Sequence, residues 1–379
     1  METVPFLHTA DLHLDEPVKG WKGSQEDLWR RHEEHRNTFR KIVDLVQERN
    51  LPFLLIAGDF LEHGYASHQT VEFVMDQFAR IPQTKVLISP GNHDPYKDGS
   101  WYKKPIWPEH VHIFSSKWEK HRFSEWNLEI HGKGFSDFAE RDGSLPEFED
   151  SPYHKLMLVH GEFQKKSMKS DYFPIQEKEL AALNYDYVAL GHIHKTSQYD
   201  LANERNTIVR YPGSPEALNW KELGERTVTI GEISSKGIQT EIIPIHTRRY
   251  LLQEINVDDC TTREKLLERI LQNSHLECKN SYITIRLVGR RYPDLPVGEE
   301  RGWLLEQIRS AGYRDLYLED ETIPDFDLER LKRKDRLICA FIEKMESRMD
   351  QVQQPKQQEL IQKALYKGLE ALIQKGIKE

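Results

Sequence analysis

The sequence contains three cysteines, Cys260, Cys278 and Cys339, which are far apart and form no CxxC pair. This scarcity argues against a disulfide framework and against a thiolate zinc site. No run approaches the ~20 consecutive apolar residues that a membrane span requires, and the first residues lack the basic-then-apolar layout of a signal peptide. We therefore expect a cytoplasmic protein without a membrane segment.

The sequence also has fewer basic than acidic residues: 53 Lys and Arg against 62 Asp and Glu, which gives a net charge of −9. The charge of the whole chain therefore gives no support for nucleic-acid binding, and any such role must rest on local basic patches. What the chain does have is length: 379 residues, 38% of them hydrophobic and 10% aromatic. At roughly 150 residues per domain, this predicts about two domains with a packed core.

Short apolar runs that read as buried strands alternate with polar turns in the first half of the chain. These runs are Pro5–Ala10, Phe53–Ala57, Lys85–Ser89, Lys155–Val159 and Tyr187–Leu190. Apolar residues at helical spacing separate the first three runs, which predicts a layered α/β domain. Further runs at Thr207–Tyr211, Thr227–Ile233 and Ile238–Ile245 lack intervening helices. We expect them to be antiparallel strands that complete a domain spanning residues 1–246.

Two later regions differ in character. Residues 247–326 combine two strand patterns with two helical patterns, which predicts a small α+β domain. Residues 327–379 carry an apolar stripe on an otherwise charged helix, an interruption at Pro355 and a second amphipathic helix. These two helices could fold back on the body of the protein or bind a partner, and the pattern leaves both open.

Residues of metal-binding type follow each strand of the first half. The clusters are Asp11-Leu12-His13, Gly58-Asp59, Gly91-Asn92-His93-Asp94, His160-Gly161 and Gly191-His192-Ile193-His194. Each is weak alone, because Asp and Gly are common in turns. Since the carboxyl ends of the strands line the ligand crevice of open α/β sheets, all five clusters are expected to converge on one site.

These five elements resemble the signature of the calcineurin-like metallophosphoesterases. His8-Thr9-Ala10-Asp11-Leu12-His13 and Tyr211-Pro212-Gly213-Ser214-Pro215 are similar to the DNA-repair exonuclease branch of that family. This branch contains the SbcD-type and MRN-complex nucleases, with the YhaO-like proteins among its bacterial members. The resemblance implies a layered β-sandwich flanked by helices, a small α+β cap domain that contacts DNA, and a C-terminal helical pair that binds a partner.

The resemblance also implies a ligand set for two divalent metal ions. Asp11, His13 and His194 would hold one ion, Asn92, His160 and His192 would hold the other, and Asp59 would bridge them. A bridging carboxylate offsets the repulsion of two cations held roughly 3.5–4 Å apart. The mixed nitrogen and oxygen donors admit Mn²⁺, Fe²⁺ or Zn²⁺, and the family favours manganese.

His93 stands beside a ligand, and the corresponding histidine of the family assists the departing oxygen. It would stabilise charge at phosphorus or protonate the leaving oxygen, with Asp94 as the acceptor that orients it. Many relatives carry a histidine three positions after the bridging aspartate, where this chain has Glu62 followed by His63. Whether His63 takes over the role of guiding the substrate stays open.

Basic residues that could follow a phosphate backbone are Lys165, Lys166 and Lys169, just after His160, and Arg290 and Arg291 in the second domain. Solvated surface side chains are the alternative for both groups. Several histidines have no motif around them, among them His110, His112 and His121, and we expect these to lie on the surface or in the core.

The sequence thus predicts a two-metal DNA nuclease that acts at DNA ends, in repair, with an SbcC-like coiled-coil ABC-type ATPase as partner through its C-terminal helices. A phosphodiesterase for nucleotides or small phosphodiesters and a non-catalytic DNA-binding or ATPase-binding scaffold are the alternatives. The oligomeric state stays open, and a homodimer is one of the alternatives.

Overall fold

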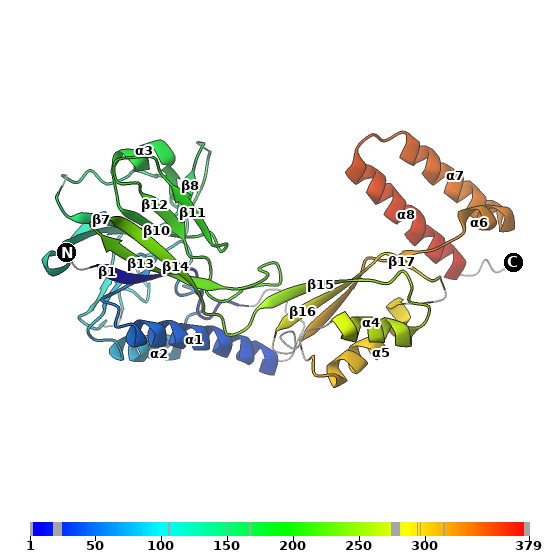
Figure 1. Ribbon diagram of the computed structural model, residues 1–379, viewed down its shortest axis with the longest axis horizontal. Helices are drawn as coiled ribbons and strands as arrows, with labels where there is room; N and C mark the ends of the chain where they lie inside the picture. The colour runs from blue at the N-terminus through cyan, green and yellow to red at the C-terminus, as the bar shows by residue number, and fades with distance from the viewer. Residues whose placement is uncertain are drawn as a thin grey trace. The chain divides into compact units, whose positions relative to one another are not determined.

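The computed structural model describes residues 3–17, 25–104, 107–149, 151–166, 168–273, 281–293, 295, 297–313 and 315–374. Cys278 lies outside these residues, as do residues 375–379 of the expected C-terminal helices. The chain divides into two compact units, Met1–Arg249 and Tyr250–Glu379 (Figure 1). No helix of the described residues has the length and hydropathy to cross a membrane.

The first unit contains two six-stranded sheets. The first sheet has the order β14-β13-β1-β2-β3-β4, in which β1 to β4 run parallel and the β13–β14 hairpin pairs antiparallel to β1. Its strands are β1 (Val4–Thr9), β2 (Phe53–Ile56), β3 (Lys85–Ile88), β4 (Val111–Ile113), β13 (Thr227–Ser234) and β14 (Gly237–Pro244).

The second sheet has the order β11-β12-β10-β7-β6-β5, with antiparallel pairs only at its two edges. Its strands are β5 (Glu119–Phe123), β6 (Leu128–Lys133), β7 (His154–His160), β10 (Tyr187–Gly191), β11 (Ser197–Asp200) and β12 (Ile208–Tyr211). The expectation that Thr207–Tyr211 is antiparallel is half wrong: β12 is antiparallel to β11 but parallel to β10.

The sheets stack face to face, and helices cover the outer face of the first. Alternation along β2 shows why, since Phe53 and Leu55 face the second sheet while Leu54 and Ile56 face the helices. Strands buried on both faces read as continuous apolar runs, which is the pattern in the sequence. The covering helices are α1 (Gln25–Glu48) and α2 (His68–Ala79) (Figure 1).

The outer face of the second sheet packs against α3 (Glu177–Ala182) and the short strands β8 (Glu162–Gln164) and β9 (Pro174–Gln176). A single 3₁₀ turn, η1 (Ser124–Trp126), joins β5 to β6. The unit is therefore a layered β-sandwich flanked by helices, which confirms the expected fold class.

The second unit begins with a three-stranded parallel sheet of β15 (Tyr250–Asn256), β16 (Tyr282–Val288) and β18 (Leu316–Asp320). The helices α4 (Arg263–Asn273) and α5 (Val297–Ser310) alternate with these strands and share one apolar core with them. Two short strands, β17 (Arg290–Arg291) and β19 (Ile323–Pro324), follow β16 and β18 in the chain and pair with each other in parallel.

The C-terminal segment forms three helices where the sequence suggests two: α6 (Leu328–Lys334), α7 (Arg336–Asp350) and α8 (Pro355–Gln374). The predicted first helix breaks because Asp335 adopts an extended conformation and caps α7, accepting hydrogen bonds from the backbone of Leu337 and Ile338. Most of the apolar stripe is buried between the helices, where Ile342 and Leu369 are fully buried. Leu337, Leu360 and Ile373 remain exposed.

Candidate metal centre

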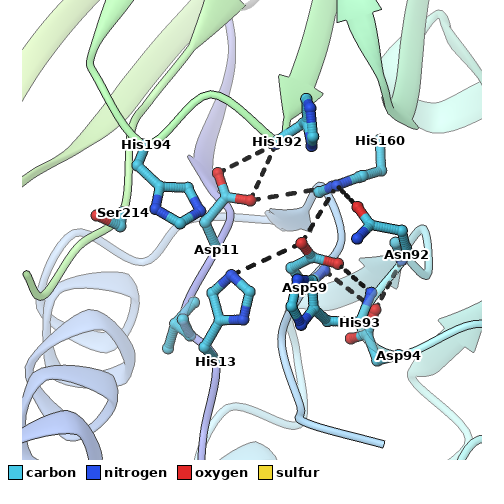
Figure 2. A network of polar contacts seen from close by, with 12 residues as sticks. Asp11, His13, Asp59, Asn92, His93, Asp94, His160, His192, His194 and Ser214 are labelled. Carbon is cyan, nitrogen blue, oxygen red and sulfur yellow. Dashed lines mark hydrogen bonds and ion pairs between the residues drawn. The ribbon is translucent and has the colours of Figure 1, made fainter. Parts of the chain in front are cut away.

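The candidate site lies where strands of both sheets end. Asp11, Asp59 and Asn92 follow β1, β2 and β3 of the first sheet, while His160 ends β7 and His192 follows β10 of the second. Figure 2 shows the side chains of Asp11, Asp59, Asn92 and His160 close together at the two sets of strand ends. The clusters that are far apart in the sequence therefore meet in one place.

The backbone of this region is strained. Asp11, His13, Asp59 and His192 all have positive φ angles, of 55°, 45°, 49° and 105°, where side chains other than glycine are uncommon. The loops after β1 and β2 hold each other in this conformation, since the N–H of Asp11 donates to Gly58 O at 3.0 Å and that of His13 to Asp59 O at 2.9 Å. Such strain persists only where the surroundings enforce it, and it concentrates at functional sites.

Two glycines allow the strand ends of the two sheets to approach. A Cβ atom at Gly58, whose φ is +83°, would lie 2.5 Å from Nδ1 of His160. A Cβ atom at Gly191 would lie 1.8 Å from the carbonyl oxygen of Ala57. No side chain fits at either position, so glycine is needed for this close contact.

Asp59 occupies the centre of the site (Figure 2). Its Oδ2 lies 3.3 Å from Nε2 of His160 and 3.6 Å from Nε2 of His13, while Oδ1 accepts a hydrogen bond from the backbone of His93 at 2.8 Å. Burial alone would raise the pKa of Asp59, but the adjacent imidazoles, first that of His160, outweigh it and lower the pKa. A single carboxylate thus faces histidines of both predicted ligand sets.

Three of the four histidines predicted to bind metal have Nδ1 held by an acceptor, which fixes each ring. Nδ1 of His160 donates to Ala57 O at 2.9 Å, Nδ1 of His13 lies 3.4 Å from Glu62, and Nδ1 of His194 lies 3.0 Å from Glu222. This arrangement frees Nε2 of each ring for a metal ion, and metal-binding histidines are commonly held in this way.

The remaining predicted ligands are adjacent. The oxygen atom Oδ1 of Asn92 lies 3.1 Å from Nε2 of His160, and ligand atoms of Asp11, His13 and His194 lie within 4.8 Å of one another. The backbone N–H of His192 donates to Asp11 at 2.9 Å. The His192 ring stands 5.3 Å from that of His160 and belongs to none of the close ligand groups found among the described residues.

His93 is held by Glu62, not by Asp94. Nδ1 of His93 lies 3.0 Å from Oε2 of Glu62, and the hydrogen bond to Glu62 raises the pKa of His93 to about 9. His63 follows Glu62 in the chain, but its ring packs edge-on against Phe138, with the ring centroids 5.5 Å apart. In the sequence Glu62 stands out only as a departure from the family pattern, and no local motif signals its contact with His93.

Asp94 does not accept a hydrogen bond from the His93 ring, which is the role that the sequence suggests for it. Its carboxylate accepts hydrogen bonds from the backbone N–H groups of Asp59, Phe60, Leu61 and Gly91 and from the hydroxyl of Tyr102, at 2.6–3.1 Å. Burial and the neighbouring Asp59 raise the pKa of Asp94, and these hydrogen bonds act against that rise. Among the described residues, the hydrogen-bond acceptor of the His93 ring is Glu62 and not Asp94. Asp94 instead fixes the loop that carries Asp59.

The segment Tyr211–Pro215, which resembles the DNA-repair exonuclease branch in sequence, makes hydrogen bonds to His194 and to the glutamate that holds its ring. Ser214 donates its backbone N–H to His194 O at 3.1 Å and its hydroxyl to Glu222 at 3.0 Å. Arg226 donates to His194 O at 2.7 Å. Glu222 was missed in the sequence because it stands outside every motif and reaches the site only through the fold.

The predicted phosphate-binding residues divide into exposed and buried ones. Lys165, Lys166 and Lys169 are exposed near β8 in the first unit. Arg290, in the second unit, is exposed and pairs with Asp325 at 3.0 Å. The prediction for Arg291 is wrong: this side chain is 6% exposed, donates to Leu295 O and pairs with Glu370, so it holds α8 in place.

The residues present fit a pair of divalent cations. Nε2 of His13 is buried without a hydrogen-bond partner among the described residues, although it points toward Asp59. A buried nitrogen lone pair without a donor is costly in a protein interior and natural beside a metal ion. The donors are imidazole, carboxylate and amide groups with no thiolate, a set that suits Mn²⁺, Fe²⁺ and Zn²⁺ alike.

Comparison with known proteins agrees with this geometry. Residues 4–196 match the family described as calcineurin-like phosphoesterase. The uncharacterized metallophosphoesterase YhaO of Bacillus subtilis (strain 168) is 30% identical over 328 residues, which cover 83% of this chain and 76% of the relative.

Two further relatives have names that refer to DNA repair or to a nuclease. The DNA double-strand break repair protein Mre11 of Methanopyrus kandleri is 22% identical over 235 residues, or 58% of this chain and 50% of the relative. A subunit of the nuclease SbcCD from Rhodobacter capsulatus is 27% identical over 94 residues, or 24% of this chain and 21% of the relative. The strand-end clusters and these matches lead to the same conclusion: the chain belongs to the calcineurin-like phosphoesterase family.

Proposed function

We propose that this chain is a DNA nuclease that hydrolyses phosphodiester bonds at DNA ends, with two divalent metal ions held by Asp11, His13, Asp59, Asn92, His160, His192 and His194. One observation carries the phosphoesterase chemistry: Asp59 faces both His13 and His160, so one carboxylate joins two ligand sets. Bound cations would supply Lewis-acid activation of water and neutralisation of phosphate charge.

We assign His93 the role of assisting the departure of the leaving oxygen. Its hydrogen bond to Glu62 keeps the imidazole protonated, and its side chain is 37% exposed, so a substrate can reach it. A protonated imidazole can donate a proton to the departing oxygen or stabilise charge on the phosphate. Cations bound beside Asp59 would lower the pKa of His93, because like charges disfavour the protonated form.

The choice of DNA rests on the named relatives and on the second unit, which a small phosphodiester would not need. The relatives named as repair proteins and as a nuclease subunit support DNA as the substrate and repair as the setting. An ABC-type ATPase with a coiled coil is the partner we propose for the helices α6 to α8, whose exposed Leu337, Leu360 and Ile373 offer apolar contacts. Manganese is the metal we propose, and the cytoplasm the location.

A substrate panel tests the proposal. With Mn²⁺ present, the purified chain should shorten end-labelled duplex DNA and hydrolyse a small chromogenic phosphodiester, and a chelator should stop both reactions. Hydrolysis of the small diester with all DNA left intact would favour the alternative of a phosphodiesterase for nucleotides. Hydrolysis of neither would favour a binding scaffold.

The partner is tested by Leu337→Asp, Leu360→Asp and Ile373→Asp, which lie on exposed positions and should leave the fold intact. Loss of co-purification with a co-expressed SbcC-like ATPase, with nuclease activity retained, would support the assignment. Unchanged co-purification would place the partner contact elsewhere.

A further inference from the structure

A second cluster of metal-binding side chains lies outside the candidate centre. It consists of His112 on β4 and of Glu119 and His121 on β5. These two strands are the edge strands of the two different sheets, and the segment 114–118 connects them directly. The cluster therefore joins the first sheet to the second at their free edges.

The spacing of the three side chains suits a metal ion. Oε2 of Glu119 lies 3.1 Å from Nε2 of His112 and 3.5 Å from Nε2 of His121. Ligands about 2.0–2.1 Å from a tetrahedral zinc ion stand roughly 3.3–3.5 Å apart. The two measured separations bracket that spacing, and the three ligand atoms lie within 4.8 Å of one another.

The cluster is also held in place by its neighbours. The other carboxylate oxygen of Glu119 accepts a hydrogen bond from the backbone N–H of Ser115 at 2.7 Å, so that Oε2 faces the imidazoles. Both rings pack edge-on against Phe114, with ring centroids 4.8 Å and 5.5 Å apart. Orientation of ligands by such contacts is a regular feature of metal sites.

We propose that His112, Glu119 and His121 bind a divalent transition-metal ion of the Zn²⁺ type and thereby clamp the two sheets together. Two imidazoles and a carboxylate favour such an ion over Mg²⁺ or Ca²⁺, which prefer oxygen ligands alone. The three side chains are 28–35% exposed, so water completes the coordination and the ion exchanges with solvent. A cation bound to both edges stabilises the folded state, because the unfolded chain offers no such site.

The test compares zinc bound per chain, by elemental analysis after equilibrium dialysis, in the unchanged protein and in His112→Gln/His121→Gln. We expect one zinc ion fewer per chain in the double variant and a smaller rise of Tm on addition of Zn²⁺. Hydrolysis of a small phosphodiester should be unchanged, because the catalytic ligands are intact. The matched control is His68→Gln, an exposed histidine on α2 whose ring contacts Trp101 and not the cluster.

A second variant guards against simple misfolding. Glu119→Gln keeps a carbonyl oxygen for the Ser115 N–H but removes the charge, and it should weaken zinc binding at this site by about tenfold or more. Equal zinc content and equal Zn²⁺-dependent Tm in all variants would show a hydrogen-bonded cluster without a metal and would overturn the proposal. Because the count is a difference between chains with the same catalytic centre, its outcome does not depend on the proposed nuclease activity.

Discussion

Glu62 holds His93: Oε2 of the glutamate lies 3.0 Å from Nδ1 of the histidine, within the loops that follow β2 and β3. The same oxygen lies 3.4 Å from Nδ1 of His13. Glu62 thus orients one side chain predicted to act on the leaving group and one predicted to bind metal. The hydrogen bond and the charge of Glu62 raise the pKa of the neighbouring His93.

Glu62→Gln should lower turnover about 10- to 100-fold, the range found when a partner behind a metal ligand or a catalytic group is removed. The glutamine keeps the shape and an acceptor oxygen, but the negative charge that helps raise the pKa of His93 is absent. Steady-state hydrolysis of a phosphodiester at saturating Mn²⁺ measures the change. Glu33→Gln, which alters a glutamate paired with Arg36 on α1, serves as the control and should retain full activity.

His93→Ala should keep the bound metal and lose about 10²- to 10⁴-fold in turnover, as expected for a positioned acid or charge stabiliser. A diester with a good leaving group needs little protonation, so its hydrolysis should fall less than that of DNA. Equal losses on both substrates would point to stabilisation of charge at phosphorus. Undiminished DNA cleavage would remove His93 from the reaction.

Asp94→Asn should destabilise the protein by about 3 kcal/mol, because an amide cannot replace a carboxylate that accepts from four backbone N–H groups and Tyr102. Tyr102→Phe removes one of those donors and should cost about 1 kcal/mol. Urea unfolding of both variants gives the two values. An Asp94→Asn protein of normal stability but without activity would restore Asp94 to a catalytic role.

The sequence predicted the strands that carry the site because each is buried on both faces and therefore apolar throughout. Phe53–Ala57 and Lys85–Ser89 match β2 and β3 to within a residue at their ends. The edge strands β4 and β5 were not predicted. β4 has only three residues, and β5 alternates between half-buried and exposed positions and carries four charged or histidine residues in five. Edge strands are specified by their neighbours more than by their own composition.

The residues predicted as metal ligands stand out in the sequence because each motif comes at or just after the end of a strand. The residues that orient them do not, since Glu62, Glu222 and the carbonyl of Ala57 become neighbours only through the tertiary fold. The same holds for Arg291, whose burial against Glu370 on α8 no local pattern reveals. Local sequence indicates the type of chemistry, and packing decides which side chains support it.

Reversal of Lys165, Lys166 and Lys169 to Glu should weaken DNA cleavage and leave hydrolysis of a small phosphodiester unchanged. The three lysines are exposed, and the net charge of −9 makes any local basic patch decisive for DNA binding. The salt dependence of binding should become shallower, by about 0.9 in the logarithmic slope for each duplex phosphate that is no longer neutralised. Reversal of Lys85, Lys178 and Lys236, which are exposed elsewhere in the same unit, is the control. If both activities fell together in the first variant, this loop would belong to the catalytic site.

Asp59→Asn tests the central claim most directly, because only a bridging ligand serves both ions at once. The measurement is the number of Mn²⁺ ions bound per chain, together with hydrolysis of duplex DNA by the same preparation. Asp98→Asn, a fully exposed aspartate paired with Lys103, is the control and should behave as the unchanged protein. We predict that Asp59→Asn loses occupancy of both ions and all detectable hydrolysis. A variant that keeps two tightly bound ions and cleaves DNA at the normal rate would contradict a two-metal centre built around Asp59.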